Sequence, residues 1–387
     1  MHRVDVTGST PPLILHVIHH LLVGGMENGL INLINTMPES SFRHIIVCIE
    51  DFSDFRQRLV RSDVRVIALR RSSIGVMKLR TEIFHLCRNL RPMIVHSRNM
   101  SGLDALLPAR IAGVKYCVHS EHGWDIDNLN GEKWKPVVQR RLHSPLIDHY
   151  ITVSKHLKKY LVKKVAITAS RITQIYNGVD TNRFIPARFK PSNVLPLNFA
   201  DENSIVFGSV GRIQPIKDQK TLVHAFATLS QKGGNIGDKA RLVIVGDGPQ
   251  LSALRDLVDL LGIKSKTWLP GAISNVQDVM QVIDVFVLPS LAEGISNTIL
   301  EAMASGLPVI ATRVGGNLEL VEEKQTGYFF DPGDIQSLVR LLTEYAANPS
   351  LRYSHAQRAR QVAIEQFNLT KMVKNYQDIY ENLCFSK

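Results

Sequence analysis

The sequence of 387 residues contains no long hydrophobic run. A helix that crosses a membrane needs about 18 to 20 consecutive apolar residues, and no stretch of this chain approaches that length. The polar segment 1–12 has no apolar core of the kind found in secretory signal peptides, and the short apolar run Leu13–Ile18 is predicted to be a strand. We therefore expect a cytoplasmic protein.

Cysteine is also scarce. Cys48, Cys87, Cys117 and Cys384 lie far apart, without the spacing of metal ligands. We expect buried or incidental thiols in a reducing compartment rather than disulfides. The dinucleotide fingerprint Gly-x-Gly-x-x-Gly is missing as well, which counts against a nicotinamide-dependent dehydrogenase.

Signals for nucleic-acid binding are absent, because no basic stretch is interleaved with stacking aromatic residues. Positive charge is nevertheless uneven. Residues 1–190 hold 28 Lys and Arg against 15 Asp and Glu, whereas residues 191–387 hold 18 against 20. The segment Ser154–Lys164 is predicted to be an amphipathic basic helix, which fits peripheral docking on an anionic membrane. An ordinary solvated helix face is the alternative.

Short apolar runs alternate with amphipathic stretches along the whole chain, which predicts an α/β protein with parallel sheets covered by helices on both faces. The proline-containing segment Pro186–Asn203 has little periodicity and is predicted to separate two domains. The predicted strands are Leu13–Ile18, His44–Ile49, Val64–Leu69, Met93–His96, Lys115–His119, His149–Val153, Ser204–Val210, Arg241–Val245, Lys266–Leu269, Asp284–Leu288, Pro308–Ala311 and Gly327–Phe330.

The segment Glu293–Glu301 carries the most informative polar residues. It follows a predicted strand and leads into a predicted helix that begins near Asn297. The N-terminus of a helix offers free N–H groups to an anion, and carboxylates accept hydrogen bonds from the hydroxyls of a sugar or ribose. This combination predicts a nucleotide-sugar pocket. The alternative is that Glu293 caps the helix and Glu301 faces solvent.

Two cations, Arg212 and Lys217, follow the predicted strand Ser204–Val210 at its carboxyl end. They could neutralise a diphosphate that departs with growing negative charge. The alternative interpretation is that both cations are ordinary surface charges. Gly24 and Gly25 follow the first strand, where glycine lets the backbone approach a ligand closely, and a plain tight turn is the alternative.

The pattern Glu-Gly-x-x-Asn-x-x-x-Glu, followed by the segment Ala304–Thr312, resembles the family 4 retaining glycosyltransferases of GT-B fold. More narrowly, the chain is similar to sugar transferases of exosortase-linked exopolysaccharide systems in bacteria. Further matching segments follow in the expected order over nearly the whole chain. They are Gly24–Glu27, Asn177–Asp180 with Phe184, Gly211–Lys217, Val245–Pro249 and Val314–Gly316.

The resemblance implies two Rossmann-like parallel-sheet domains that face a central cleft. We expect an acceptor-binding domain at residues 1–187 and a nucleotide-sugar donor domain at residues 188–365. The C-terminal helix, 366–387, is expected to pack back on the first domain. The implied reaction is retaining sugar transfer from a nucleotide-diphosphate sugar to a glycan or a polyprenyl-diphosphate-linked acceptor.

The resemblance also assigns roles to residues. Arg212 and Lys217 are expected at the diphosphate, Glu293 at the donor sugar, and Glu301 at the ribose. His122 follows the predicted strand Lys115–His119 and is expected near the transferred sugar, and a hydrogen-bonded loop residue is its alternative. Backbone around the remaining donor-site residues is expected to contact the sugar, the diphosphate and the nucleobase. They are Gly24, Gly25, Gly271, Ala272, Gly294, Ile295, Ser296 and Asn297.

Asp125-Ile126-Asp127 has the Asp-x-Asp form that holds a metal in a different glycosyltransferase fold. It follows His122-Gly123 in a loop of the first domain, so we expect neither metal nor cofactor besides the sugar nucleotide. Other functions on this fold are a nucleotide-sugar epimerase, a phosphorylase or a non-catalytic sugar-binding protein. The intact Glu and Arg/Lys motifs disfavour the epimerase and the binding protein, and we identify no pyridoxal-phosphate lysine site for a phosphorylase.

Overall fold

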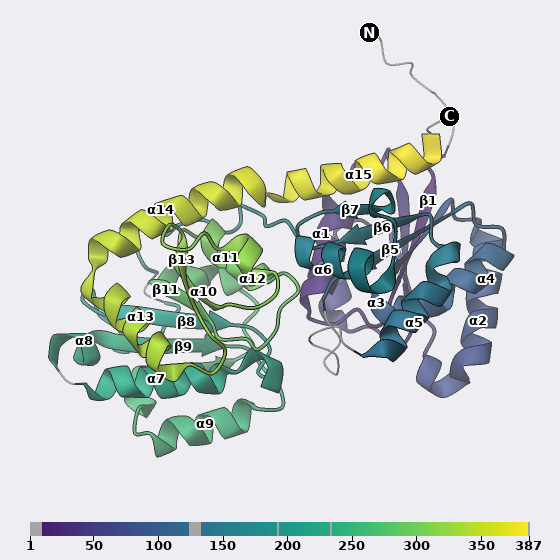
Figure 1. The fold of residues 1–387 in the computed structure, drawn as a ribbon. Coiled ribbons are helices and arrows are strands. Elements are labelled where there is room, and N and C mark those ends of the chain that lie inside the picture. Colours follow the sequence, from purple (N-terminus) through teal and green to yellow (C-terminus); the bar gives the residue numbers. More distant parts are fainter. Residues whose placement is uncertain (1–9, 124–132, 192, 233, 386–387) are drawn as a thin grey trace, which may run out of the picture. The chain divides into compact units, whose positions relative to one another are not determined.

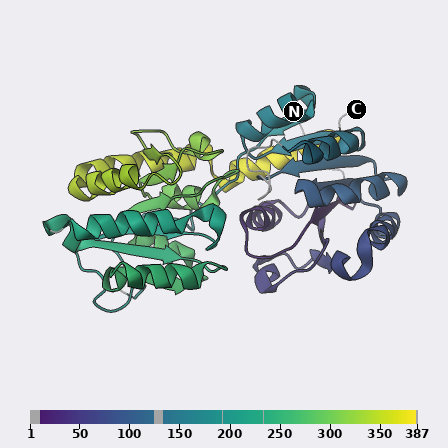
Figure 2. The same cartoon turned by 60° about the horizontal axis from the view of Figure 1, so that its bottom comes forward.

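The computed structural model describes residues 10–123, 133–191, 193–232 and 234–385. Its contacts divide the chain into two compact units. The described residues up to Tyr176, together with Leu369–Phe385, form the first unit, and Asn177–Asn368 form the second. Each unit is an α/β layer structure with helices on both faces of its sheet (Figures 1 and 2).

The first unit contains a seven-stranded parallel sheet in the order β3-β2-β1-β4-β5-β6-β7. Its strands are β1 (Leu13–Ile18), β2 (Arg43–Cys48), β3 (Arg65–Ala68), β4 (Ile94–Arg98), β5 (Tyr116–Glu121), β6 (His149–Thr152) and β7 (Ile172–Gln174). Its helices are α1 (Gly25–Thr36), α2 (Arg71–Leu90), α3 (Asn99–Gly102), α4 (Leu106–Ile111), α5 (Trp134–His143), α6 (Lys155–Tyr160) and α15 (Leu369–Phe385). Short turns of helix are η1 (Asp54–Arg58), η2 (Leu103–Ala105), η4 (Ser144–Leu146), η5 (Leu161–Val165) and η6 (Ala169–Arg171).

The C-terminal helix α15 packs on one face of the first sheet. Met372, Tyr376 and Tyr380 are buried in the same cluster as Ile94 of β4 and Val118 of β5. Because side chains alternate between the faces of a strand, the residues next to Ile94 and Val118 point to the opposite face. The last helix of the chain therefore belongs to the core of the first unit.

The second unit contains a six-stranded parallel sheet in the order β10-β9-β8-β11-β12-β13. Its strands are β8 (Ile205–Val210), β9 (Ala240–Val245), β10 (Thr267–Gly271), β11 (Val285–Leu288), β12 (Val309–Thr312) and β13 (Gly327–Phe330). Its helices are α7 (Gln219–Gln231), α8 (Gly234–Lys239), α9 (Leu251–Leu260), α10 (Val276–Val282), α11 (Asn297–Ala304), α12 (Asn317–Leu320), α13 (Ile335–Ala347) and α14 (Pro349–Gln366), with short turns η7 (Pro215–Lys217) and η8 (Lys264–Lys266).

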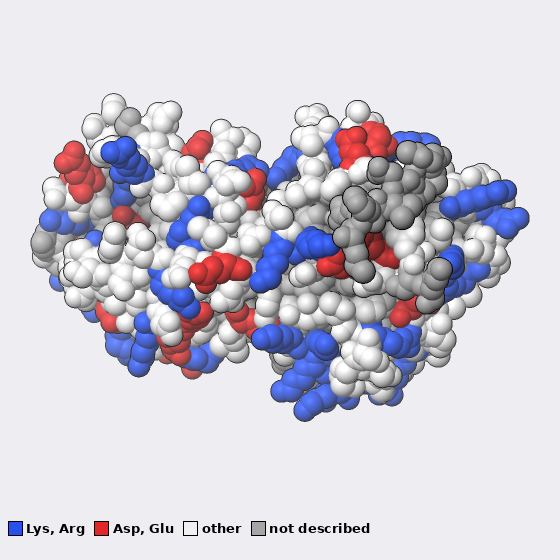
Figure 3. Space-filling model, turned by 90° about the horizontal axis from the view of Figure 1, so that it is seen from above, with Lys and Arg blue, Asp and Glu red and all other residues white. Residues whose placement is uncertain are grey.

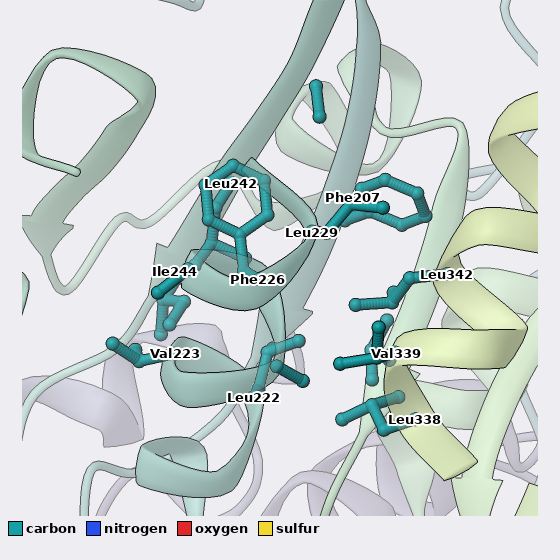
Figure 4. Close-up of a cluster of buried hydrophobic side chains, with 14 of the residues drawn as sticks. Phe207, Leu222, Val223, Phe226, Leu229, Leu242, Ile244, Leu338, Val339 and Leu342 are labelled. Atoms are coloured by element: carbon teal, nitrogen blue, oxygen red, sulfur yellow. The ribbon is translucent and has the colours of Figure 1, made fainter. Parts of the chain in front are cut away.

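Helices α7 and α13 cover one face of the second sheet and share with it a cluster of buried side chains (Figure 4). Members of this cluster include Phe207 of β8, Leu242 of β9, Phe226 of α7 and Leu342 of α13. Burying each such side chain stabilises the fold by about 1.5 to 3 kcal/mol. The sheet is thereby held rigidly, and its carboxyl edge is a fixed platform for loops.

The segment after β7 belongs to the second unit, so the contacts place the division before the expected boundary at residue 187. Val179 N donates to Phe367 O at 2.8 Å, and Arg360 Nη1 donates to Phe184 O at 2.7 Å. These bonds tie the segment to the end of α14 and to its interior. The proline-containing stretch that follows forms no helix or strand in its described residues.

The predicted fold class, two parallel Rossmann-like sheets, is confirmed, and each predicted strand is present within one or two residues. β7 and several helices, among them α5, α10 and the long α14, were not predicted. The predicted basic helix Ser154–Lys164 is a short α-helix, α6, that continues as one π-helical turn, η5.

None of the helices that the structure describes is both long and apolar enough to span a membrane.

Candidate functional site

The second sheet changes its winding direction next to β8. From β8 the chain moves outward through β9 and β10, and it then returns to the other side of β8 with β11. The loops after β8 and β11 diverge at such a point, and ligands of open α/β sheets bind there, beyond the carboxyl ends of the strands. Lys217 lies on the loop after β8, and Glu293 lies on the loop after β11.

Lys217 and Glu293 form an ion pair at this switch point. Lys217 Nζ donates to Glu293 Oε1 at 2.5 Å, and Ser290 Oγ donates to the same oxygen at 2.7 Å. The Glu293 side chain is almost buried, whereas that of Lys217 is one-fifth exposed. Glu293 Oε2 makes no bond to any residue in the described part of the chain, so it can accept one from a ligand.

Backbone and side-chain bonds hold the two loops in register. Leu291 N donates to Ile216 O at 2.8 Å, which joins the loop after β11 to the turn η7. Thr312 Oγ1, at the end of β12, donates to Ser290 O at 2.5 Å. Ser290 and Thr312 are fully buried. The ion pair therefore stands on a rigid support rather than on mobile surface loops.

Gly315 and Gly316 allow the next loop to lie directly against Glu293 and Gly294. A Cβ atom on Gly315 would overlap the carbonyl oxygen of Glu293, and one on Gly316 would overlap that of Gly294. Gly315 also has a φ of 46°, in the left-handed region. These contacts explain why a glycine pair follows β12 at this position.

Helix α11 begins beside the ion pair. Ser296 is its N-cap, and its Oγ accepts from Ile299 N at 3.3 Å. Asn297 Oδ1 accepts from Asn177 Nδ2 at 2.7 Å, so the Asn177–Asp180 segment supports the start of this helix. Glu301 lies one turn further along, and it is half-buried.

The remaining donor-side residues lie along the same edge of the second sheet. Arg212 directly follows Gly211, and its side chain is exposed, without a hydrogen bond to any described residue. Gly271 ends β10 with a φ of 88°, and its carbonyl oxygen accepts from Gly246 N at 2.9 Å. Ala272, which follows, is exposed.

The first sheet has a switch point of the same kind, between β1 and β4. Gly24 is the N-cap of α1, and Gly25 begins the helix. The φ of Gly24 is −166°, an extended conformation, so the residue uses the close approach that glycine allows and not a left-handed turn. The Glu27 carboxylate occupies the position where a Cβ atom on Gly24 would lie.

His122 follows β5 at this edge, and Asn99 fixes its backbone. His122 N donates to Asn99 Oδ1 at 2.8 Å, and Asn99 Nδ2 contacts Met26 Sδ of α1 at 3.6 Å. Asn99 has a φ of 52°, a conformation that asparagine tolerates better than most residues. One side chain thus links the loops that follow β1, β4 and β5.

The imidazole of His122 is neutral. Burial, and then the charge of Arg98, lower its pKa to about 3. Nδ1 and Nε2 are both buried, and neither has a hydrogen-bond partner among the described residues. A neutral ring that is held by its backbone can donate from one nitrogen and accept at the other, which suits recognition of a hydroxyl group.

Arg98 lies beneath this loop, fully buried. Its Nη1 contacts His16 Nδ1 at 3.1 Å, and its Nη2 contacts His96 Nδ1 at 3.4 Å. His96 Nδ1 also lies 2.7 Å from Tyr380 Oη on α15. Burial, and then the Arg98 charge, lower the pKa values of His16 and His96, so both rings stay neutral and present lone pairs to the guanidinium.

A second buried network lies on the opposite face of the first sheet. Arg140 of α5 donates to Glu121 through Nε at 2.5 Å and through Nη2 at 3.0 Å. His119 lies inside β5 and contacts Ser97 Oγ at 2.8 Å and Glu121 Oε1 at 3.3 Å. Burial alone would raise the pKa of Glu121, but Arg140 and His119 outweigh it and hold that pKa well below its usual value.

The structure thus gathers the predicted residues at two sheet edges, one in each unit. The edge of the second unit holds Arg212, Lys217, Gly271, Ala272, Glu293, Gly294, Ile295, Ser296, Asn297 and Glu301, and the edge of the first unit holds Gly24, Gly25 and His122. Asp125 and Asp127 lie outside the described residues. Among the residues that are described, no group of three or more His, Cys, Asp or Glu side chains is arranged to hold a metal ion.

The sequence analysis missed Asn99, Arg98 and Ser290. Each of them stands within two residues of the end of a strand that was correctly predicted. Polar residues at the carboxyl ends of strands that flank a switch point would have been a sufficient signal.

Two family models match the chain, one in each half. Residues 23–183 match the model described as Glycosyltransferase Family 4, and residues 197–362 match that described as Glycosyl transferases group 1. The chain carries both domains of a GT-B glycosyltransferase.

Individual relatives agree with this assignment. The UDP-Gal:alpha-D-GlcNAc-diphosphoundecaprenol alpha-1,3-galactosyltransferase of Escherichia coli is 27% identical over 385 residues, which span 97% of this chain and 98% of that enzyme. The N-acetyl-alpha-D-glucosaminyl L-malate synthase of Bacillus anthracis is 31% identical over 179 residues, which span 46% of each chain.

A solved structure supports the fold of this glycosyltransferase. Alr3699/HepE of Anabaena, solved in complex with UDP and glucose, superposes with a TM-score of 0.82 over 96% of this chain and 100% of that chain. The two sequences are 20% identical, so this similarity bears on the fold alone.

Proposed function

We propose that this protein is a retaining, metal-independent glycosyltransferase that moves a sugar from a nucleotide-diphosphate sugar to a lipid-linked glycan acceptor. The observation that carries the proposal is the Lys217–Glu293 ion pair at the switch point of the second sheet. We assign the cation of this pair to a leaving diphosphate and its carboxylate to a sugar hydroxyl. We place the reaction in bacterial surface polysaccharide or exopolysaccharide synthesis, in the group with exosortase-linked systems.

Lys217 and Arg212 stabilise the leaving group. When the bond between the sugar anomeric carbon and the diphosphate oxygen breaks, negative charge grows on the nucleoside diphosphate. Arg212 presents an exposed guanidinium that can hold two phosphate oxygens, and Lys217 acts as a point charge. Preorganised cations of this kind are typically worth about 3 to 4 kcal/mol of the barrier.

Glu293 positions both the donor sugar and Lys217. Its Oε1 already accepts from Lys217 and Ser290, so Oε2 is the oxygen that can accept from a donor-sugar hydroxyl. Glu301, further along α11, binds the ribose hydroxyls. The backbone from Gly294 to Asn297 at the start of α11 holds the sugar and diphosphate, and that near Gly271 and Ala272 contacts the nucleobase.

His122 recognises a hydroxyl group and is not the general base. A ring with a pKa of about 3 is too weak a base to remove a hydroxyl proton efficiently. In a front-face mechanism the acceptor oxygen bonds to the anomeric carbon on the face from which the diphosphate leaves, and the acceptor proton passes to a phosphate oxygen of the leaving group. The configuration is retained, and the reaction needs neither a metal ion nor a further cofactor.

The acceptor is a glycan or a polyprenyl-diphosphate-linked sugar. This proposal is supported by the Escherichia coli relative, whose name specifies a diphosphoundecaprenol-linked acceptor. Such an acceptor lies at a membrane surface, so we also propose that the enzyme works as a peripheral protein on the inner, anionic face. Lys155, Lys159, Lys163 and Lys164 of the basic segment are exposed, whereas Lys158 Nζ donates to Ile172 O at 2.9 Å and is a structural residue.

Thermal shift against a panel of nucleotide-diphosphate sugars tests the proposed donor site. A donor present at a hundredfold excess over its Kd stabilises the folded protein by about 2.7 kcal/mol. We expect one or a few donors to raise the Tm of the wild type and of Lys220→Ala, an exposed lysine of α7. The same donors should raise the Tm of Lys217→Ala less. A panel without any shift would contradict the proposal.

A further inference from the structure

Helix α5 presents an unusual apolar stripe to solvent. Trp134, Val138 and Leu142 are 67%, 39% and 72% exposed. They are spaced four residues apart, so they lie along one face of the helix. The opposite face is the buried one, since Arg140 is held there by the bidentate contact with Glu121. The stripe is therefore carried by a helix whose opposite face is anchored in the first unit.

Two further apolar side chains are exposed nearby. Leu107 and Ile111 of α4 are 46% and 66% exposed, and they too are four residues apart. Helices α4 and α5 both contact the turn η4, and Arg110 Nε of α4 donates to Leu146 O of this turn at 3.0 Å. Exposed apolar residues that are grouped in this way indicate an interaction surface.

Cations flank the stripe of α5. Arg141 Nε donates to Val165 O at 3.0 Å, and Arg141 Nη2 donates to Lys164 O at 2.7 Å, so η5 with Lys163 and Lys164 lies beside the end of the helix. Lys133 and Lys135 stand at its beginning and are exposed. Figure 3 shows Lys and Arg side chains grouped along the lower edge of the first unit, in the right-hand part of the view.

Acidic residues are nearly absent from this part of the sequence. Between Lys133 and Val165 the chain has nine Lys and Arg, and Asp148 is its single acidic residue. The Asp148 carboxylate is occupied, because its Oδ2 lies 2.5 Å from Arg110 Nη2. An apolar stripe between cations complements a surface that is negatively charged outside and apolar beneath.

We infer that α5 inserts the stripe of Trp134, Val138 and Leu142 into the interfacial layer of an anionic lipid bilayer. Tryptophan favours this layer because its ring is apolar and its N–H remains near the headgroups. The flanking lysines then pair with lipid phosphates, and each cation near an anionic surface adds up to about 1 kcal/mol. The inference extends the proposed function. It rests on that function in one respect, because a lipid-linked acceptor lies at a membrane surface.

Co-sedimentation of the full chain with vesicles tests the inference. We expect binding to phosphatidylglycerol vesicles at low salt and much less to phosphatidylcholine vesicles. The double variant Trp134→Ser with Leu142→Ser should lose at least tenfold in partition coefficient. Matched controls are Leu260→Ser and Phe189→Ser, exposed apolar residues of the second unit, which should bind like the wild type.

Fluorescence gives a second readout. Quenchers attached to the lipid acyl chains should reduce the emission of the wild type, and Trp134→Phe should remove most of that quenching. Equal binding by the double variant and the wild type, equal binding to neutral vesicles, or no binding to anionic ones would overturn the inference. So would a dimer in solution that the double variant dissociates, because the stripe would then bind a second copy.

The proposed function can fail separately. Nucleotide-sugar binding is measured without lipid, and we expect the double variant to bind the donor like the wild type. If the protein docks on vesicles but binds no sugar nucleotide, the proposed function is refuted and the inferred membrane-binding surface is retained.

Discussion

Both units have a switch point at the carboxyl edge of their sheet, but the residues at these two edges differ in charge and in burial. At the switch point of the second sheet, a charged pair stands in reach of solvent, with Lys217 bonded to Glu293 and Arg212 exposed beside it. At that of the first sheet, neutral histidines enclose a single buried cation, Arg98, and His122 lies above them without a hydrogen-bond partner for either ring nitrogen among the described residues.

The difference shows what each edge can do. Accessible charged groups can form ion pairs with a ligand. In the proposed reaction, the diphosphate of the donor replaces Glu293 in part of its contact with Lys217. Buried neutral rings cannot follow a changing charge, but they hold hydrogen-bond geometry firmly. We therefore assign the charge-stabilising part of the reaction to the second unit and hydroxyl recognition to the first.

Acid should destabilise the first unit more than the second. The pKa values of His16, His44 and His96 are lowered by burial, to about 3 for His44, so the folded protein binds fewer protons at these sites than the unfolded chain. Stability is then complete above the ordinary histidine pKa of about 6.5 and is lost as the pH falls from there toward the folded value. For His44 this loss is about 2 kcal/mol by pH 5.

Hydrogen exchange of the full chain at pH 7 and pH 5, corrected for the intrinsic rates, measures this effect. Peptides from β1 and β4 should lose protection, and those from β8 and β9 should lose much less. Equal loss in both units would mean that the histidine network does not set the acid sensitivity.

Lys217→Ala should lower kcat/KM by about a hundredfold or more, since a preorganised donor at a developing charge is worth about 3 kcal/mol. The variant should fold, because the side chain lies at the sheet edge and not in a core cluster. The control is Lys220→Ala, an exposed lysine of α7. Steady-state kinetics that find near-normal turnover in Lys217→Ala would remove this lysine from the mechanism.

Variants of the two glutamates should distinguish binding of the nucleotide from binding of the donor sugar. Glu301→Gln is expected to weaken the binding of both a nucleoside diphosphate and the sugar nucleotide by about tenfold, because a hydrogen bond to a charged group is worth about 1.5 to 3 kcal/mol. Glu293→Gln should weaken the sugar nucleotide but not the diphosphate alone, since it frees Lys217 from its ion pair. Calorimetry with both ligands decides, with Glu202→Gln as control, and equal losses of diphosphate affinity in both variants would show that the assignment is wrong.

Asn99→Ala should act only indirectly, through the position of His122. It removes the acceptor for His122 N and places alanine in a left-handed conformation, each at a cost of about 1 kcal/mol. We expect kcat to fall about tenfold and KM for the donor to stay unchanged, because Asn99 positions His122 and lies in the first unit. Asn99→Asp keeps the acceptor oxygen and should retain most of the activity. A normal kcat in Asn99→Ala would refute this positioning role.

Much of this architecture could be predicted from the sequence. Apolar runs such as Asp284–Leu288 identify strands because strands of parallel sheets are buried on both faces. The ion pair was not predictable, since Lys217 and Glu293 are joined only by the order of strands in the sheet. The neutral state of His122 also depends on burial beside Arg98, and helix α5 was missed because its apolar residues face solvent rather than a core.

The most direct test of the central claim is the stereochemistry of sugar transfer in the presence of excess chelator. A nucleotide-diphosphate sugar of known anomeric configuration and a lipid-linked acceptor are incubated with the enzyme, and the anomeric configuration of the product is read by NMR. We expect a product with the configuration of the donor, formed at the same rate with and without chelator. An inverted product, or activity that chelator abolishes and Mg²⁺ or Mn²⁺ restores, would contradict it.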